Sequence, residues 1–161
     1  MIEDKLRLNG RIKVQAINAE TGEIVKEVEK SNLVVTLGLE LTSKNWITGF
    51  TQDVVNNMAI GSGKRETSLS DTDLEYEEYR KGIDGSSVTK PSPSETLVEA
   101  RIAPGVPDSQ PFEIREIGWF TGTSDDSDAF MFSRIDLQDN PVPKDDDTEV
   151  RVIYQVGFKN V

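Results

Sequence analysis

One stretch near the end decides the fold class of this chain: Glu149-Val150-Arg151-Val152-Ile153-Tyr154-Gln155-Val156-Gly157-Phe158. All of its even-numbered residues are apolar or aromatic, whereas Glu149, Arg151 and Gln155 place charge and polarity at odd positions. A period of two residues is typical of a β-strand that has one face in the core and the other in water. We therefore expect a strand over 149–158.

The beginning of the chain shows the same period. One face carries the apolar residues Leu6, Leu8, Ile12, Val14 and Ala16. The other face carries Arg7, Arg11, Lys13 and Gln15. A polar turn that ends at Gly22 follows, and 23–30 has the composition of a second strand, so the two segments predict a β-hairpin.

The spacing then changes to that of a helix. Leu33, Leu37 and Leu41 are four residues apart, and Ser31-Asn32 offers a capping side chain before them. This pattern predicts a helix over 35–47 that ends at Gly49. Gly38 in its interior opposes the prediction by about 1 kcal/mol relative to alanine.

The rest of the chain is mostly strand-like. We expect strands over 58–61, 96–103, 112–120 and 129–137, a strand or an irregular arm over 74–83, and a mobile loop over 84–95. Several short strands with turns between them predict a mainly β fold, an antiparallel β-sandwich with one packed α-helix and long loops. A length of 161 residues fits a single domain, with 1–30 as an N-terminal hairpin extension.

Composition narrows the function. A net charge of −11 disfavours nucleic acid as a partner, because phosphates are repelled. The absence of His and Cys excludes Ser-His-Asp and Cys-His catalysis and the usual structural zinc sites. The sequence has no apolar run of about 18 residues and no signal-peptide start. We therefore expect a soluble protein that is made in the cytoplasm, without a membrane span.

Acidic runs raise the question of a bound cation. They are Asp71/Asp73/Glu75, Asp125/Asp126/Asp128 and Asp145/Asp146/Asp147, and none has the glycine and glutamate spacing of an EF-hand. We expect solvated loops, with Asp125, Asp126 and Asp128 as weak candidates for Ca²⁺ and no other cofactor. The segment Gly61-Ser62-Gly63-Lys64 lacks the full phosphate-loop pattern and predicts a tight turn.

Two tryptophans could in principle stack on a sugar. Trp46 and Trp119 both stand among apolar neighbours, which favours packing in the core over stacking on a ligand. Paired carboxylates can hydrolyse glycosidic bonds, but the sequence does not show the separation that this chemistry needs.

Four stretches, taken in order, resemble a known family. They are Ser31-Asn32-Leu33-Val34-Val35-Thr36 with Gly38; Met58-Ala59-Ile60-Gly61-Ser62-Gly63; Thr72-Asp73-Leu74-Glu75-Tyr76-Glu77-Glu78-Tyr79-Arg80; and Ile114-Arg115-Glu116-Ile117-Gly118-Trp119-Phe120 with Met131-Phe132-Ser133-Arg134. This succession resembles the N-terminal domain of tail-collar fibre proteins and related small tail proteins of tailed bacterial viruses, over roughly 31–158. The resemblance implies a structural attachment module that docks fibres at the baseplate or tail.

The resemblance therefore leads us to expect a non-enzymatic virion protein, a tail or baseplate adaptor that binds other virion proteins. It also implies a homo-oligomer, with a trimer favoured by analogy with fibres. The alternatives are a capsid decoration or turret subunit, a carbohydrate-binding module for host recognition, and an enzyme that uses paired carboxylates. The expected interface elements are the hairpin, with its basic residues, and the 84–95 loop.

Residues of the fourth stretch also carry physical expectations. Glu116 stands on an otherwise apolar strand beside Arg115, so it needs a cationic partner if it is buried, and Arg80 or Arg134 could serve. Gly118, next to Trp119, is expected to allow close backbone approach at a bulge. The candidate interface or structural residues are Arg7, Arg11, Lys13, Arg80, Arg115, Glu116, Gly118, Trp119 and Arg134.

Overall fold

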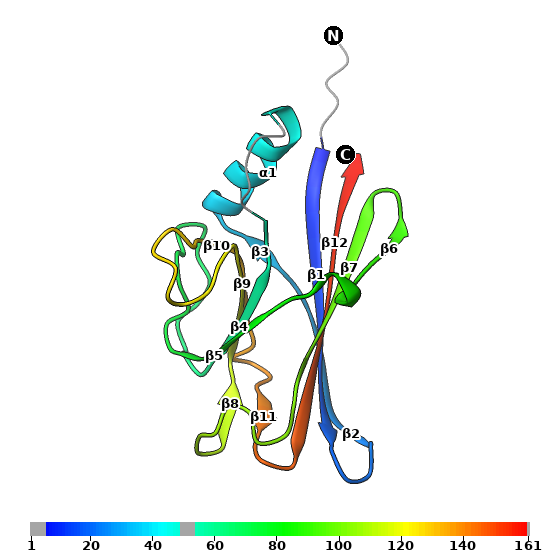
Figure 1. Cartoon of the computed structure of the whole chain (residues 1–161), viewed down its shortest axis with the longest axis vertical. Coiled ribbons are helices and arrows are strands. Elements are labelled where there is room, and N and C mark those ends of the chain that lie inside the picture. The colour runs from blue at the N-terminus through cyan, green and yellow to red at the C-terminus, as the bar shows by residue number, and fades with distance from the viewer. Residues whose placement is uncertain (1–5, 49–53, 161) are drawn as a thin grey trace.

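The protein is a sandwich of two antiparallel sheets, and the prediction of a mainly β fold with one helix is confirmed (Figure 1). The computed structural model describes residues 6–48 and 54–160, without the side chains of 6–7, 43–48 and 159–160. Sheet A has the order β2 (Ile24–Ser31), β1 (Leu6–Asn18), β12 (Thr148–Asn160), β7 (Glu95–Ile102) and β6 (Val88–Ser92). Sheet B has the order β3 (Leu33–Val34), β10 (Met131–Asp136), β9 (Glu116–Phe120), β4 (Asn57–Gly61) and β5 (Glu77–Gly82). The short strands β11 (Val142–Lys144) and β8 (Phe112–Ile114) pair with each other.

The predicted hairpin of β1 and β2 is present, and it is an integral part of sheet A. β1 pairs with β12 along its whole length, from Leu6 opposite Asn160 to Asn18 opposite Thr148. The beginning of β1 and the end of β12 therefore lie side by side at the same end of the molecule (Figure 1). The β1 side chains of Ile12, Val14 and Ala16 are 0% exposed, so the hairpin supplies part of the main core.

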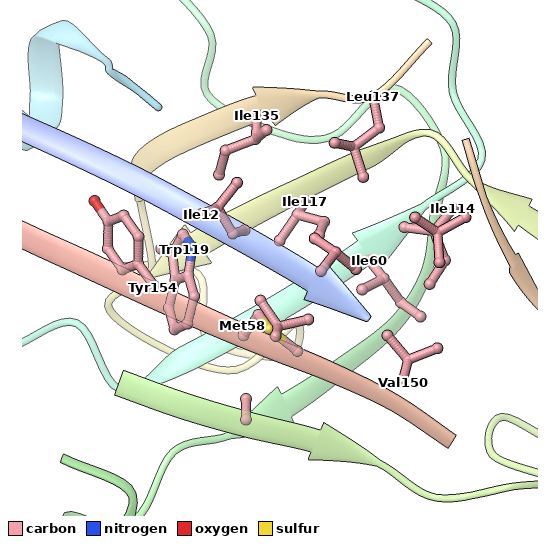
Figure 2. Close-up of a cluster of buried hydrophobic side chains, with 14 of the residues drawn as sticks. Ile12, Met58, Ile60, Ile114, Ile117, Trp119, Ile135, Leu137, Val150 and Tyr154 are labelled. Atoms are coloured by element: carbon pink, nitrogen blue, oxygen red, sulfur yellow. The ribbon is translucent and has the colours of Figure 1, made fainter. Parts of the chain in front are cut away.

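That core fills the space between the two sheets. Figure 2 shows isoleucines of sheet B and of β1 pointing toward one another, with the rings of Trp119 and Tyr154 lying together. The ring centroids of Trp119 and Tyr154 are 4.7 Å apart at an interplanar angle of 21°. Trp119 is 0% exposed, which confirms that it packs in the core. The Trp46 side chain lies outside the described residues.

Helix α1 (Thr36–Thr48) confirms the helix predicted over 35–47, and Gly49, where it was expected to end, lies outside the described residues. Gly38 has a packing reason despite its low helix propensity. A Cβ built on it would overlap the backbone oxygen of Phe132 in β10. The start of the helix therefore lies directly against sheet B. A second small core, of Val35, Ala59, Leu74, Phe120 and Met131, forms on this outer side of the sheet.

Several strand boundaries differ from the prediction. The strand expected over 112–120 is broken at Arg115 into β8 and β9, which belong to different sheets. The loop expected over 84–95 contains a 3₁₀ turn η1 (Gly85–Ser87) and β6, because Val88 and Thr89 pair with β7. The uncertain segment 74–83 contains β5. Two short strands, β3 and β11, were not predicted; three residues that include Pro143 carry little strand signal.

Candidate functional site: a buried arginine cluster

A buried arginine connects β10, β9 and the loop of residues 62–76. The Arg134 side chain is 0% exposed, and its Nε and Nη2 donate to one oxygen of Glu116 at 3.1 and 2.8 Å. Nη1 donates to Asp71 at 2.8 Å and to the Glu66 carbonyl at 3.0 Å, and Nη2 also donates to the Arg65 carbonyl at 2.8 Å. A guanidinium has five N–H groups, so every donor of Arg134 has an acceptor. We name Arg134, Glu116 and Asp71 the arginine cluster.

Glu116 binds the turn that leaves β4. Its Oε1 accepts hydrogen bonds from the amides of Gly63 at 3.1 Å and Tyr76 at 2.8 Å, and its Oε2 accepts one from the Glu75 amide at 3.0 Å. A Cβ on Gly61 or on Gly63 would collide with Oε1 of Glu116. The glycines of the segment that partly resembles a phosphate loop therefore make room for a carboxylate of the chain itself.

Asp71 and Glu75 hold the rest of the 62–76 loop. Asp71 accepts a hydrogen bond from the Ser68 amide at 2.9 Å and lies 3.3 Å from the Arg65 guanidinium. The exposed Glu75 accepts hydrogen bonds from the amides of Arg65 and Lys64, which lower the pKa of its carboxyl. The loop is thus fastened to the sheet by hydrogen bonds to carboxylates and to one guanidinium.

The charge balance of the arginine cluster favours a permanently ionised Arg134. Burial disfavours its charge, but the hydrogen bonds that Arg134 donates to Asp71 and Glu116, together with the negative charges of these two acids, outweigh burial and raise the pKa of Arg134. A buried charge keeps its ionised form only with such partners. The cluster is closed to solvent, since Glu116 is 1% and Asp71 is 3% exposed. The arginine cluster therefore has a structural role: it binds the 62–76 loop to sheet B.

The predicted partner of Glu116 is Arg134, and Arg80 has a different role. Arg80 donates to both carboxylate oxygens of Glu77, at 2.9 and 2.6 Å, and to the Gly122 carbonyl at 3.1 Å. Its guanidinium carbon lies 3.7 Å from the centre of the Phe120 ring, a cation–π geometry. Arg80 therefore ties the edge strand β5 to the loop that follows β9. Arg115 pairs with Glu113 on the preceding strand β8.

The expectation for Gly118 needs correction. Gly118 pairs in regular register with Ala59 and Arg134, and the irregularity of this pair of strands lies in β10, between Met131 and Ser133. A Cβ on Gly118 would lie 2.6 Å from Cε2 of Phe120. The glycine thus makes room for an aromatic side chain and does not mark a bulge.

The basic face expected on the hairpin is largely neutralised. Lys13 lies 2.7 Å from Glu29 and 3.6 Å from Glu27, both on β2, and hydrogen bonding to Glu29 raises the pKa of Lys13. Arg11 is exposed on the same side of the sheet, and the side chain of Arg7 lies outside the described residues. Strand pairing therefore places an acid beside the central base of the predicted patch.

The weak calcium candidates do not form a ligand set. Asp125, Asp126 and Asp128 are exposed in the loop between β9 and β10, where Asp126 accepts a hydrogen bond from the Asp128 amide at 3.0 Å. Within residues 6–48 and 54–160, no three acidic side chains gather in a geometry that could hold a metal ion.

Two buried polar groups, one in the arginine cluster and one outside it, are not evident from the sequence. Asp71 stands in one of the acidic runs, although its contact to Arg134 spans 63 residues of sequence. Lys144 is 3% exposed and donates only to the carbonyls of Asp145 at 2.8 Å and Thr148 at 3.0 Å among the described contacts. The one signal is an arginine between the apolar residues of the Met131–Asp136 strand, because a charge in a buried strand requires a buried partner.

Comparison with family models, with curated proteins and with solved structures gave no match to this chain. Across the described part of the chain, no helix has the length and apolar character needed to cross a bilayer.

Proposed function

We propose that this chain is a non-enzymatic structural protein of a tailed virus particle, acting as a tail or baseplate adaptor or a fibre-attachment subunit. One observation supports the proposal most directly: three of the four stretches that resemble the tail-collar family meet around the arginine cluster, and the first stretch packs on the strand that carries Arg134. The turn at Gly63 and the amides of Glu75 and Tyr76 bind Glu116, and Arg134 binds Glu116 from β10.

The first stretch joins the same body through α1. The Val35 amide donates to the Phe132 carbonyl at 3.1 Å, and Gly38 packs on that backbone. Residues that are separate in sequence thus determine one another's positions. A shared fold is the simplest reason for such an ordered set of short motifs, and an attachment module works through the surface of a rigid fold.

The chemistry of the buried acids supports a non-catalytic role. Asp71 and Glu116 are the most buried acids among the described residues, and Arg134 and backbone amides occupy their oxygens. A general acid or base must reach a substrate proton, which these carboxylates do not. The carbohydrate-binding alternative loses Trp119 as a stacking platform, because this buried ring stacks on Tyr154.

Labelling of purified particles tests the proposal. Particles of the virus whose genome encodes this chain are probed with gold-labelled antibodies against the chain. We expect the label at the tail end of the particle. Label on the head supports a decoration or turret subunit, and absence of the chain from particles contradicts both. If the isolated chain binds reproducibly to sugars on a glycan array, this result supports host recognition instead.

A further inference from the structure

Within residues 6–48 and 54–160, no helix or loop lies over the outer face of sheet A. This face is formed by the side chains that alternate with the core residues of β1, β2, β12 and β7. In contrast, α1 and the 62–76 loop lie over the outer side of sheet B (Figure 1). We propose that the outer face of sheet A is a two-fold contact surface for a second copy of this chain. This proposal does not depend on the virion role.

The first argument is charge. Among the described side chains, the bases on this face are Arg11, Lys13, Arg101 and Arg151. The acids are Glu27, Glu29, Glu95, Glu99 and Glu149. Over the described side chains of these four strands, the formal charge of the face is therefore −1, whereas the whole chain carries −11. Two copies that approach through most other surfaces bring acid against acid, which disfavours association. This face allows approach without that repulsion.

The second argument is that the face is complementary to itself. Strand register places Glu27, Gln15, Arg151 and Arg101 in one row across four strands. An isologous contact places residue i against j and j against i. A two-fold axis that runs along the strands between β1 and β12 therefore sets Glu27 of each copy opposite Arg101 of the other. The two side chains are 42% and 54% exposed, so both can reach a partner.

The neighbouring row of residues is also compatible with this two-fold axis. It consists of Glu29, Lys13, Ile153 and Glu99, and the axis places Glu29 opposite Glu99. Each of these acids already has a base of its own chain, with Lys13 at 2.7 Å from Glu29 and Arg151 at 2.6 Å from Glu99. The axis also places the half-buried Ile153 against the aliphatic stem of Lys13. This row contributes apolar contact near the centre of the surface.

Size and order fit a specific contact. Four strands about 4.8 Å apart, with about eight residues each, present roughly 500 Å² per copy, or about 1,000 Å² for the pair, which is the size of the smaller specific interfaces. Side chains on the face are already ordered by hydrogen bonds within one copy. Gln15 is only 7% exposed and donates a hydrogen bond to Glu27 at 2.6 Å. Pre-ordered side chains lose less entropy on binding.

The strand edges are poorer contact surfaces. The register of β2 shifts opposite Ala16 and Ile17 of β1, and the register of β5 shifts opposite Gly61 of β4. The edge strand β6 contains Pro91. Bulges and prolines protect edges against pairing with another chain. A face-to-face contact is thus favoured over extension of sheet A.

Charge reversal with mixing tests the proposed geometry. Sedimentation equilibrium follows the full chain, E27K, R101E and a 1:1 mixture of the two variants. The unmodified chain is expected to dimerise. Each variant alone places like charges opposite each other twice, which should raise its dissociation constant by at least about tenfold.

The mixture should restore association. The lysine introduced by E27K then faces the glutamate introduced by R101E, and the second contact keeps its original pair of Glu27 and Arg101. Both contacts of the heterodimer therefore join opposite charges, so it should form with near-original affinity.

The control reverses a charge away from this face. K64E makes the same kind of change at an exposed residue and should dimerise like the unmodified chain. Circular dichroism and thermal melting verify that each variant is folded. A chain that stays monomeric up to roughly millimolar concentration, or forms trimers, overturns the proposal. So does a pair of variants that dimerise normally alone, or a mixture that fails to restore association.

Discussion

Arg134 and Glu116 lie on adjacent strands of sheet B and are joined by two hydrogen bonds of 2.8 and 3.1 Å with both side chains at most 1% exposed. Removing two charges from water is costly, and their attraction offsets that cost only when the remaining polar atoms are also satisfied. Here Asp71, two carbonyls and three amides complete the arrangement. The pair therefore depends on the 62–76 loop, and the loop depends on the pair.

Arg134→Met should be strongly destabilising. It leaves the buried carboxylates of Glu116 and Asp71 without their base, which costs about 3–5 kcal/mol. Denaturant unfolding measures the loss, and proteolysis within 62–76 should accelerate. The matched control is Arg115→Met, whose half-buried side chain pairs with the exposed Glu113. That change should cost less than about 1 kcal/mol. Equal losses in the two variants would contradict a special role for Arg134.

Sequence analysis predicted the elements that depend on neighbouring residues and missed those that depend on contacts between distant residues. β1 and β12 were predicted because a period of two residues is local, and α1 because its leucines recur every four residues. The break at Arg115 was not predictable from the same pattern. The Arg115 amide bonds to the Gly61 carbonyl at 2.9 Å, and its own carbonyl accepts from the Leu137 amide at 2.7 Å, both distant in sequence.

The candidate site shows the same limit. The need of Glu116 for a cation was predictable from its apolar neighbours, and Arg134 was one of two proposed partners. The acceptors on the 62–76 loop were not predictable, because loop closure over tens of residues leaves no periodic signal. The neutralisation of Lys13 likewise depends on register, which places Glu29 directly opposite it.

Gly38→Ala should destabilise the protein even though alanine is the better helix former. Helix propensity favours the change by about 1 kcal/mol. The added Cβ, however, overlaps the Phe132 backbone oxygen, and overpacking of this kind costs about 1–3 kcal/mol or more. Thermal unfolding should therefore show a lower Tm. Gly85→Ala is the control, since its Cβ meets no atom within 4 Å. A raised Tm in Gly38→Ala would show that α1 does not rest on β10.

Calcium should have little effect on stability. Asp125, Asp126 and Asp128 are exposed and do not converge, so they offer too few oxygens at one point for tight binding. Addition of about 1 mM Ca²⁺ should shift the Tm by less than about 1 °C, as should its removal by a chelator. Mg²⁺ is the control for general screening of the acidic chain. A shift of several degrees that is specific to Ca²⁺ and is lost in Asp126→Asn would contradict this expectation.

Two buried groups control stability at alkaline pH, with opposite signs. Burial lowers the pKa of Lys144 below its ordinary 10.5, so the folded state releases this proton before the unfolded chain does. The unfolded state then binds more protons, and stability rises as the pH increases toward 10.5. Replacement by Met should abolish this rise, which is measurable as the slope of unfolding free energy against pH.

Tyr154 should cause the loss of stability at higher pH. Burial raises its pKa from 10.0 to about 12, against the nearby Ser133 hydroxyl and a hydrogen bond from Asn32, which lower it. The folded state keeps the phenolic proton where the unfolded chain has lost it, so the contribution of Tyr154 to stability is constant below pH 10 and falls between pH 10 and 12. Two pKa units correspond to about 2.7 kcal/mol at most. Tyrosinate absorbance should show one tyrosine of three titrating last, together with unfolding. Tyr154→Phe should remove both the late titration and the fall in stability; a variant that retains the fall would assign it to another group.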